Sequence, residues 1–157
     1  MKTQRVYFAS PWFNDAQVAM MQEGKNKLEN NPTIDWFNSY VPLDHQYKGL
    51  DVEHHPELMN DVEWQQGTYL GDISGIIGTD LVVALVDPDN MDEGVAFEMG
   101  YAMANNKPVV VVLPDGDDTT SLNLMVAKGC TQVITMSEVN SFNFNQVPAK
   151  PYLGRVF

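Results

Sequence analysis

Two continuous apolar runs place the strongest constraint on how this chain of 157 residues can fold. The runs are LVVALV at residues 81–86 and PVVVVLP at residues 108–114. Strands that are buried on both faces, as in parallel sheets covered by helices, have this unbroken β-branched character. Between them lies DNMDEGVAFEMGYAMANN, which starts at Asp89 and is interpreted as a helix. The three segments therefore predict a strand, a crossover helix and a second, parallel strand.

Strands and helices alternate along the rest of the chain as well. A short buried strand is predicted over 5–10 and a helix over 15–29, which the sequence NNP ends. Later segments are interpreted as a strand or extended segment (35–43), a loop (45–57), a long helix (57–77), a short helix (122–128), a last strand (132–136) and an irregular tail. This alternation predicts an α/β fold of one domain, residues 1–157, with a doubly wound, parallel, five-stranded sheet of flavodoxin-like or Rossmann-like topology.

Ligands bind to sheets of this kind beyond the carboxyl ends of the strands. Three segments should meet there: 10–15 after the first strand, 87–92 after LVVALV, and the turn after PVVVVLP. The last of these leads into acids that are interpreted as a solvated loop, Asp115, Asp117 and Asp118. The sequence therefore predicts one crevice with the acidic segment 87–92 at its edge.

The formal net charge is −12, and the nine Lys and Arg residues form no cluster in the sequence. Nucleic-acid binding depends on clustered basic residues, so a nucleic acid is not an expected partner. A highly phosphorylated substrate is disfavoured for the same electrostatic reason. The alternative interpretation is that the acidity serves solubility.

Several features are missing from the sequence, and these absences constrain the expected location and cofactors of the protein. No apolar segment approaches the ~20 residues that cross a bilayer, so no membrane association is expected. No signal pattern is visible near the N-terminus, and the single cysteine, Cys130, fits a reducing cytoplasm. The adjacent His54 and His55 lack partners at ligand spacing, so no metal site is predicted. No GxGxxG motif opens a helix after the first strand, so no cofactor is expected.

One carboxylate, Glu98, lies in the middle of the otherwise apolar helix that begins near Asp92. Asp92 is a good N-cap residue, which puts Glu98 in the second turn and lets its side chain lean over Gly94. Because Gly94 has no side chain, a gap is expected above the carboxylate, near the ligand-binding edge of the sheet. A carboxylate in an apolar pocket needs a hydrogen-bond donor, and Tyr7 of the first strand is a candidate. The alternative is that Glu98 lies on the exposed side of the helix.

Asp72 raises the same alternatives, because it lies among apolar positions of the long helix. Alone it would be interpreted as a surface residue. Acids that converge on one crevice instead suggest chemistry at a sugar, where one carboxylate attacks the anomeric carbon and another protonates the leaving group. Aromatic residues could stack on a base or belong to the core; these are Trp12, Phe13 and Trp64.

Six stretches together resemble a known family: VYFASPWF, NPTIDWFNSYVPLDHQYKG, TYLGDISGI, DEGVAFEMGYA, LNLM and FNFN. Over essentially its whole length, the chain resembles the nucleoside 2-deoxyribosyltransferases of lactobacilli. The stretch YVPLDHQYKG is similar to the branch that accepts both purines and pyrimidines. The resemblance implies an enzyme that transfers the 2-deoxyribosyl group between the bases of 2′-deoxynucleosides and free nucleobases. It also implies a covalent glutamyl-deoxyribosyl intermediate and retention at C1′.

The resemblance implies roles for individual residues. Glu98 matches the family nucleophile, and Tyr7 matches the tyrosine that orients it. Asp72 and Asp92 match acids that contact the base and help to protonate the leaving group. The expected substrate-binding residues are Phe13 as an aromatic wall, Gln46 as a base contact, and Gly94, which leaves the gap above the nucleophile.

A second group of matches concerns assembly. Asn123 and Met125, in LNLM, match residues that the family donates to the sugar from a neighbouring subunit. The family's terminal carboxylate also reaches the sugar hydroxyls, and here it belongs to Phe157, where the family often ends in Tyr. The resemblance therefore implies a homohexamer built from dimers that share their sites.

Two other functions stay open from the residues. One is a nucleoside or nucleotide N-glycosidase on the same scaffold, with water as the acceptor, although the acidic segment disfavours a 5′-phosphate. The other is a non-catalytic, flavodoxin-like binding module, in which Glu98 would be dispensable.

Overall fold

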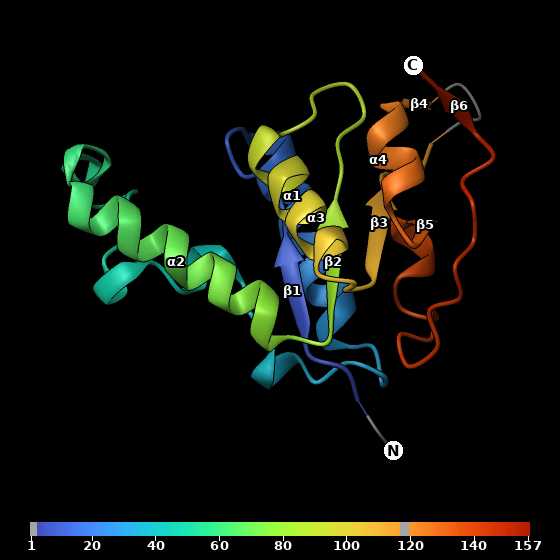
Figure 1. Cartoon of the computed structure of the whole chain (residues 1–157), viewed down its shortest axis with the longest axis horizontal. Helices are drawn as coiled ribbons and strands as arrows, with labels where there is room; N and C mark the ends of the chain where they lie inside the picture. Colours follow the sequence, from blue (N-terminus) through green and yellow to red (C-terminus); the bar gives the residue numbers. More distant parts are fainter. Residues whose placement is uncertain (1–2, 117–119) are drawn as a thin grey trace.

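A parallel sheet forms the centre of the molecule in the computed structural model, which describes residues 3–116 and 120–157. Its strands are β1 (Val6–Ala9), β2 (Leu81–Leu85), β3 (Val109–Leu113) and β5 (Gln132–Thr135). They lie in the order β1-β2-β3-β5, and every neighbouring pair is parallel (Figure 1). All residues of β1, β2 and β3 are buried. The prediction of a parallel α/β fold from the two apolar runs is therefore confirmed.

The regular sheet has four strands rather than the predicted five, because segment 35–43 forms no ladder. It runs beside β1 and pairs with it only through one isolated bridge, Tyr7 with Tyr40, and a second bridge joins Gln4 and Ile34 just before the two segments. Two 3-10 turns occupy most of the segment, Trp36–Asn38 and Pro42–Asp44. Asp35 caps the first turn, and Pro42 has no N–H to donate to a ladder.

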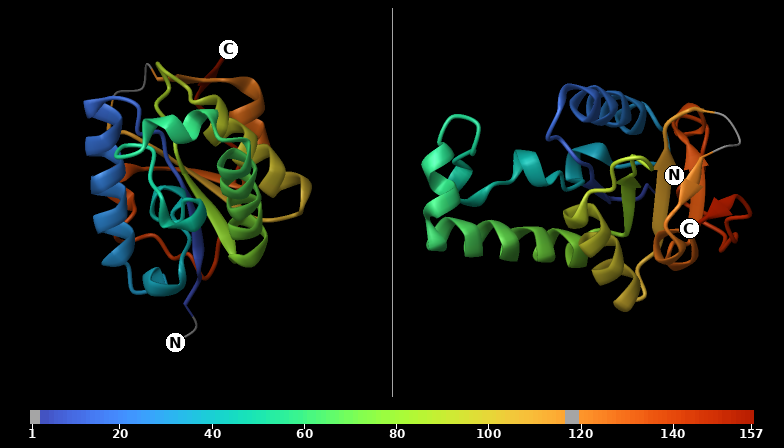
Figure 2. Two further views of the ribbon diagram at one scale, coloured as in Figure 1. Left: turned by 90° about the vertical axis from the view of Figure 1, so that its left-hand side faces the viewer. Right: turned by 90° about the horizontal axis from the view of Figure 1, so that it is seen from above.

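Helices cover both faces of the sheet (Figure 2). On one face, α1 (Asp15–Glu29) packs with the segment that follows β5, and their core includes Phe8, Leu28 and Phe144. On the other face lie α2 (Val62–Gly78), α3 (Glu93–Ala104) and α4 (Leu124–Gly129). The amino-terminal half of α2 projects well beyond the sheet (Figures 1 and 2). It packs there against the 3-10 turns Tyr47–Gly49 and Pro56–Asn60, in the region predicted as a loop.

Several boundaries differ from the sequence prediction because side chains cap the helices. Asp61 accepts hydrogen bonds from two backbone N–H groups, so α2 begins at Val62 rather than at residue 57. The Asn123 side chain caps α4 by accepting a hydrogen bond from Met125 N. The tail ends in a short strand, β6 (Arg155–Val156), which pairs with β4 (Ser121–Leu122). Asp115 is exposed, as predicted, whereas Asp117 and Asp118 lie outside the described residues.

Candidate active site

A cavity of about 450 Å³ lies beyond the carboxyl ends of β1 and β2. Segments from four parts of the chain form its wall. These are Ser10, Trp12 and Phe13 after β1, Pro42, Leu43, Gln46, Val52 and Met59 before α2, Trp64, Thr68 and Asp72 of α2, and Asp92, Gly94, Val95 and Glu98 at the start of α3. Most of this lining is apolar, and it includes all the predicted acids.

The predicted composition of the crevice is correct for two of its three parts. Residues from 10–15 and 87–92 do line the cavity, but the turn after β3 does not. That turn borders a different cavity, of about 610 Å³, together with residues of β5 and the tail. Residues of α2 and of the turns before it form the remaining wall. They reach the cavity because the projecting half of α2 lies on the β1 side of the sheet (Figure 1).

Glu98 is half-buried and faces the cavity. The Tyr7 hydroxyl, held by the fully buried β1, donates a hydrogen bond to Glu98 Oε1 at 2.5 Å. Burial raises the pKa of Glu98 to about 7, and the charges of Asp72 and Asp92 add to the rise, while the bond from Tyr7 opposes it. Burial, followed by the nearby charge of Glu98, also raises the pKa of Tyr7 far above its usual value, so Tyr7 remains a donor.

Asp92 is the N-cap of α3, as the sequence predicted, and its Oδ1 accepts a hydrogen bond from Val95 N at 2.7 Å. A side chain at Gly94 would place a Cβ atom 3.0 Å from that oxygen. The glycine therefore leaves space beside the Asp92 carboxylate. Both Asp92 and Gly94 line the cavity.

Asp72 enters the same cavity from α2 and is also half-buried. Burial raises its pKa to about 6, whereas a hydrogen bond from Tyr40 and the charge of His45 lower it. The Tyr40 hydroxyl donates to Asp72 Oδ1 at 3.2 Å. Glu98 and Asp72 are thus two carboxyl groups with raised pKa values that meet neutral phenol donors in one cavity.

The predicted base contacts, Phe13 and Gln46, both line the cavity. Phe13 is 68% exposed and stacks on Trp12 with ring centroids 5.0 Å apart. Gln46 is buried, accepts a hydrogen bond from Val52 N at 3.1 Å and donates to Leu43 O at 3.4 Å. Gln46 therefore holds the turns before α2 in place around the cavity that it lines.

Asn123, Met125 and Phe157 do not line this cavity. They lie near one another at the other end of the molecule, where α4, β4 and β6 meet (Figure 1). Leu124 N donates to Phe157 O at 3.0 Å, and Phe157 N donates to Leu122 O at the same distance. The Met125 and Phe157 side chains are 78% and 69% exposed.

Sequence reasoning did not identify Thr68, which lines the cavity between Trp64 and Asp72. The signal was present, because these three residues are spaced four apart and share one face of a helix. Met59 and Val52 were also missed, since they lie on turns whose position depends on distant packing.

No group of three His, Cys, Asp or Glu side chains is placed to hold a metal ion within residues 3–116 and 120–157. Over the same ranges, no helix is long and apolar enough to cross a membrane.

A pair of carboxyl groups with raised pKa values, in an apolar cavity at the carboxyl edge of a parallel sheet, is suited to chemistry at a glycosidic carbon. Comparison with known proteins specifies the class. The sequence model of the nucleoside 2-deoxyribosyltransferase family matches residues 6–145. The chain belongs to this family, and it is therefore an enzyme that transfers deoxyribosyl groups.

Individual relatives support the assignment over the whole length. The chain is 41% identical to a nucleoside deoxyribosyltransferase of Lactobacillus leichmannii over 157 residues, which is 100% of both chains. It is 42% identical to one of Lactobacillus johnsonii over 146 residues, covering 93% of this chain and 98% of the relative. A solved 2-deoxyribosyltransferase of Bacillus psychrosaccharolyticus superposes with a TM-score of 0.77 at 24% identity, covering 95% and 99% of the two chains, which shows a shared fold.

Proposed function

We propose that this enzyme exchanges the base of a 2′-deoxynucleoside for a free nucleobase by two successive displacements at C1′. The Glu98 carboxylate attacks C1′, the C1′–N bond breaks, and a covalent deoxyribosyl-enzyme remains. A second base then attacks the same carbon and releases Glu98. Because C1′ is inverted twice, its configuration is retained. The observation that carries the proposal is the single short bond from Tyr7 to Oε1, which holds the carboxylate at the cavity wall.

The other polar residues have complementary roles. Tyr7 orients Glu98 and stabilises its ionised form, which is the nucleophile. Asp72, whose pKa lies near 6, gives a proton to the leaving base and takes it back from the incoming one. Asp92, at the N-terminus of α3, contacts the base edge from the opposite wall.

The cavity suits a flat and uncharged base. Phe13 and the buried Gln46 line it, and Gly94 leaves space beside Asp92. A net charge of −12 would repel phosphate groups but not a neutral nucleoside or a free nucleobase. The substrates proposed here are accordingly 2′-deoxynucleosides and free purine or pyrimidine bases.

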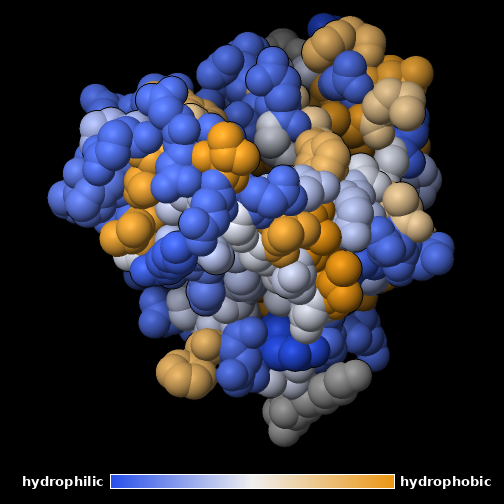
Figure 3. Space-filling view, turned by 60° about the vertical axis from the view of Figure 1, so that its left-hand side comes forward, coloured by the Kyte–Doolittle hydropathy of each residue, from blue (hydrophilic) through white to orange (hydrophobic). Residues whose placement is uncertain are grey.

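We further propose that a neighbouring copy of the chain completes the site in a homohexamer. A second groove, of about 310 Å³, leads from Asp72 and Glu98 outward between α2 and α3. Its outer wall includes Tyr69 and Phe97, which are 47% and 51% exposed. Apolar patches interrupt the polar surface on the side of the molecule that carries α2 (Figure 3). An apolar groove that opens next to the nucleophile suits an interface that contributes to the site.

The residues proposed to enter that groove are Asn123, Met125 and the terminal carboxylate of Phe157 from a neighbouring subunit. They are grouped and exposed in this chain, far from its own cavity, as such a contribution requires. We also propose that residues 1–157 act as one domain in the cytoplasm, where the half-buried Cys130 thiol would stay reduced.

Base exchange provides the direct test. The enzyme is incubated with 2′-deoxyinosine and adenine, and the products are separated by chromatography. We expect 2′-deoxyadenosine to form faster than free deoxyribose. The reverse order would support an N-glycosidase, in which water is the acceptor. Mass spectrometry of protein quenched during turnover should find a deoxyribosyl adduct on the peptide that contains Glu98, and an unmodified peptide during steady product formation would exclude the covalent route.

A further inference from the structure

A stack of three rings lies behind the two carboxyl groups of the site. Tyr40 stacks on His45 with centroids 4.3 Å apart and on Tyr7 with centroids 5.4 Å apart. The planes of the two tyrosine rings differ by only 7°. Tyr7 donates to Glu98 and Tyr40 donates to Asp72, so two parallel phenols serve two neighbouring carboxyl groups.

The backbone holds Tyr40 in register with Tyr7. Tyr40 N donates to Val6 O at 2.8 Å, and Phe8 N donates to Tyr40 O at 2.9 Å. Tyr40 is therefore bonded to the residues on either side of Tyr7 in β1, and the bridge between the two tyrosines follows from this pairing. These backbone bonds fix the main chain of Tyr40 beside the buried strand β1.

Helix α2 provides the space that Tyr40 needs. A Cβ atom at Gly75 would lie 2.6 Å from carbons of the Tyr40 ring, and one at Gly71 would lie 3.2 Å from its hydroxyl oxygen. Glycine within a helix costs about 1 kcal/mol relative to alanine. Two glycines, one of them adjacent to Asp72 in the sequence, thus let the ring approach α2 closely enough for its hydroxyl to reach Asp72.

We propose that Tyr40 is a positioning residue for proton transfer by Asp72. Its hydroxyl donates a hydrogen bond to Oδ1 of Asp72. This bond fixes the plane of the carboxyl group and leaves Oδ2 to carry the proton. As the C1′–N bond breaks, its electron pair goes to the base, and the proton on Oδ2 moves to a ring nitrogen of that base. The carboxylate left behind keeps the bond from Tyr40. In the second displacement the incoming base returns a proton to Oδ2. This inference rests on the proposed role of Asp72.

The test compares two leaving groups in the variant Tyr40→Phe, which keeps the stacked ring and removes the hydroxyl. Guanine needs a proton to leave 2′-deoxyguanosine well, whereas 7-methylguanine leaves 7-methyl-2′-deoxyguanosine as a neutral molecule without one. Base release in the first turnover is measured by rapid quench at saturating substrate. We expect a loss of about tenfold with 2′-deoxyguanosine, comparable to the loss of one hydrogen bond at the transition state, and less than twofold with the methylated substrate. Equal losses with both substrates would overturn the proposal, because they would indicate a general structural role.

Two further variants make the result specific. Tyr47→Phe is the matched control, because Tyr47 also packs against a glycine of α2, Gly67, but its hydroxyl bonds to the exposed Glu63. It should leave both rates unchanged. Glu98→Ala should abolish release of both bases, and if it does not, the proposed covalent function fails independently of Tyr40.

A double-mutant cycle completes the test. If Tyr40 acts through Asp72, then Tyr40→Phe should slow release from 2′-deoxyguanosine by less than twofold once Asp72→Asn is present. A further tenfold loss in the Asp72→Asn background would show that the Tyr40 hydroxyl acts elsewhere, and it would overturn the assignment.

Discussion

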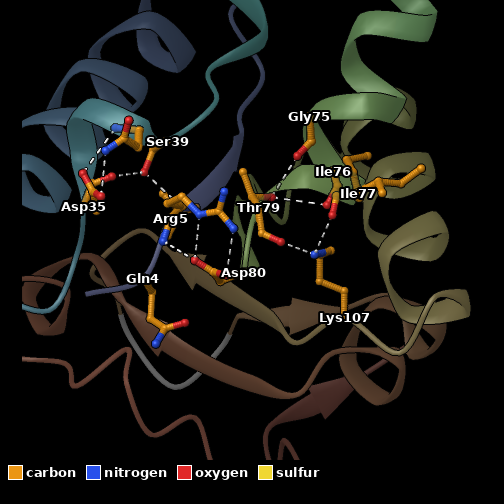
Figure 4. A network of polar contacts seen from close by, with 12 residues as sticks. Gln4, Arg5, Asp35, Ser39, Gly75, Ile76, Ile77, Thr79, Asp80 and Lys107 are labelled. Carbon is orange, nitrogen blue, oxygen red and sulfur yellow. Dashed lines mark hydrogen bonds and ion pairs between the residues drawn. The ribbon is translucent and has the colours of Figure 1, made fainter. Parts of the chain in front are cut away.

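The two ends of the sheet use charged residues in opposite ways. At the amino end, Arg5 pairs with Asp80 through a bond of 3.1 Å from Nη2 to Oδ1, and the Arg5 backbone N–H donates to Oδ2 at 2.8 Å (Figure 4). Close by, the Lys107 ammonium donates to the carbonyl oxygens of Thr79 and Ile77 at the end of α2 (Figure 4). At the carboxyl end, Glu98 and Asp72 receive bonds from tyrosine hydroxyls.

The pKa values follow from these partners. The hydrogen bond from Arg5 holds the pKa of Asp80 below its usual value, so this carboxylate is charged throughout the neutral range. Glu98 and Asp72, which burial raises to pKa values of about 7 and about 6, change protonation near neutral pH. Cations at the amino end stabilise a fixed charge, whereas neutral donors at the carboxyl end leave the charge adjustable, as acid–base chemistry requires. Substitutions at the two ends of the sheet should therefore differ in their effects on kcat and on the free energy of unfolding.

The largest expected effect is on the rate, at the carboxyl end. Glu98→Ala removes the proposed nucleophile and should lower kcat for base exchange by at least ~10³-fold. Glu93→Ala is the matched control, because Glu93 lies five residues earlier in α3 and is exposed. Its kcat should remain within about twofold of the unmodified enzyme. Near-normal turnover of Glu98→Ala in a chromatographic assay would favour a different nucleophile or a binding function.

The second-largest expected effect is a gain in the free energy of unfolding, which also comes from a substitution of Glu98. Because the folded-state pKa of Glu98, about 7, lies above the ordinary value of 4.5, ionisation favours the unfolded chain. This penalty is absent below pH 4.5, grows as the pH rises toward 7 and is complete above it. Glu98→Gln keeps an acceptor for Tyr7 and should raise the free energy of unfolding by about 1–3 kcal/mol at pH 8.

Urea denaturation at pH 8 and pH 4, at one protein concentration, measures this gain. The difference between Glu98→Gln and the unmodified enzyme should disappear at pH 4. A gain of equal size at both pH values would mean that the side-chain charge is not its cause.

The third effect belongs to the amino end and should change stability without changing the rate. Lys107→Met keeps the apolar stem but removes the ammonium group that bonds to the end of α2. We expect the free energy of unfolding to fall by about 1 kcal/mol, with kcat unchanged. Lys150→Met, at an exposed position, is the control and should have little effect on either quantity. A large loss of kcat in Lys107→Met would show that the two ends are coupled.

The same comparison explains how much the sequence could predict. The strands β2 and β3 and the start of α3 follow from local patterns, because apolar runs and the N-cap Asp92 act within a few residues. The failure to extend the sheet beyond β1 could not be predicted in this way. Tyr40 pairs with β1 through a single bridge, and its place depends on glycines of α2 some thirty residues later in the chain.

The residues of the candidate site likewise divide into those that local patterns predict and those that depend on long-range packing. The place of Glu98 at the ligand-binding edge and its bond with Tyr7 could be anticipated, because Asp92 fixes the start of the helix and the first strand carries Tyr7 to the same region. The wall contributed by Gln46 and Thr68 could not, because it depends on how far α2 projects past the sheet. Local patterns therefore made Glu98 a candidate site residue, and long-range packing decided what surrounds it.

The smallest expected effect concerns the chain end, which does not line the cavity of its own subunit. Phe157 is tied to residues 122 and 124 by two backbone bonds, which hold the terminal carboxylate beside α4 on an exposed surface. Deleting Phe157 moves that carboxylate by about one residue, roughly 3.3 Å. If it binds the sugar of a neighbouring subunit, KM for 2′-deoxyinosine should rise about threefold, since one solvent-exposed, charge-assisted contact is worth little. Leu153→Ala, which changes an exposed side chain of the same tail, should leave KM unaltered. An unchanged KM after the deletion would remove the chain end from the site while leaving Glu98 and Asp72 in place.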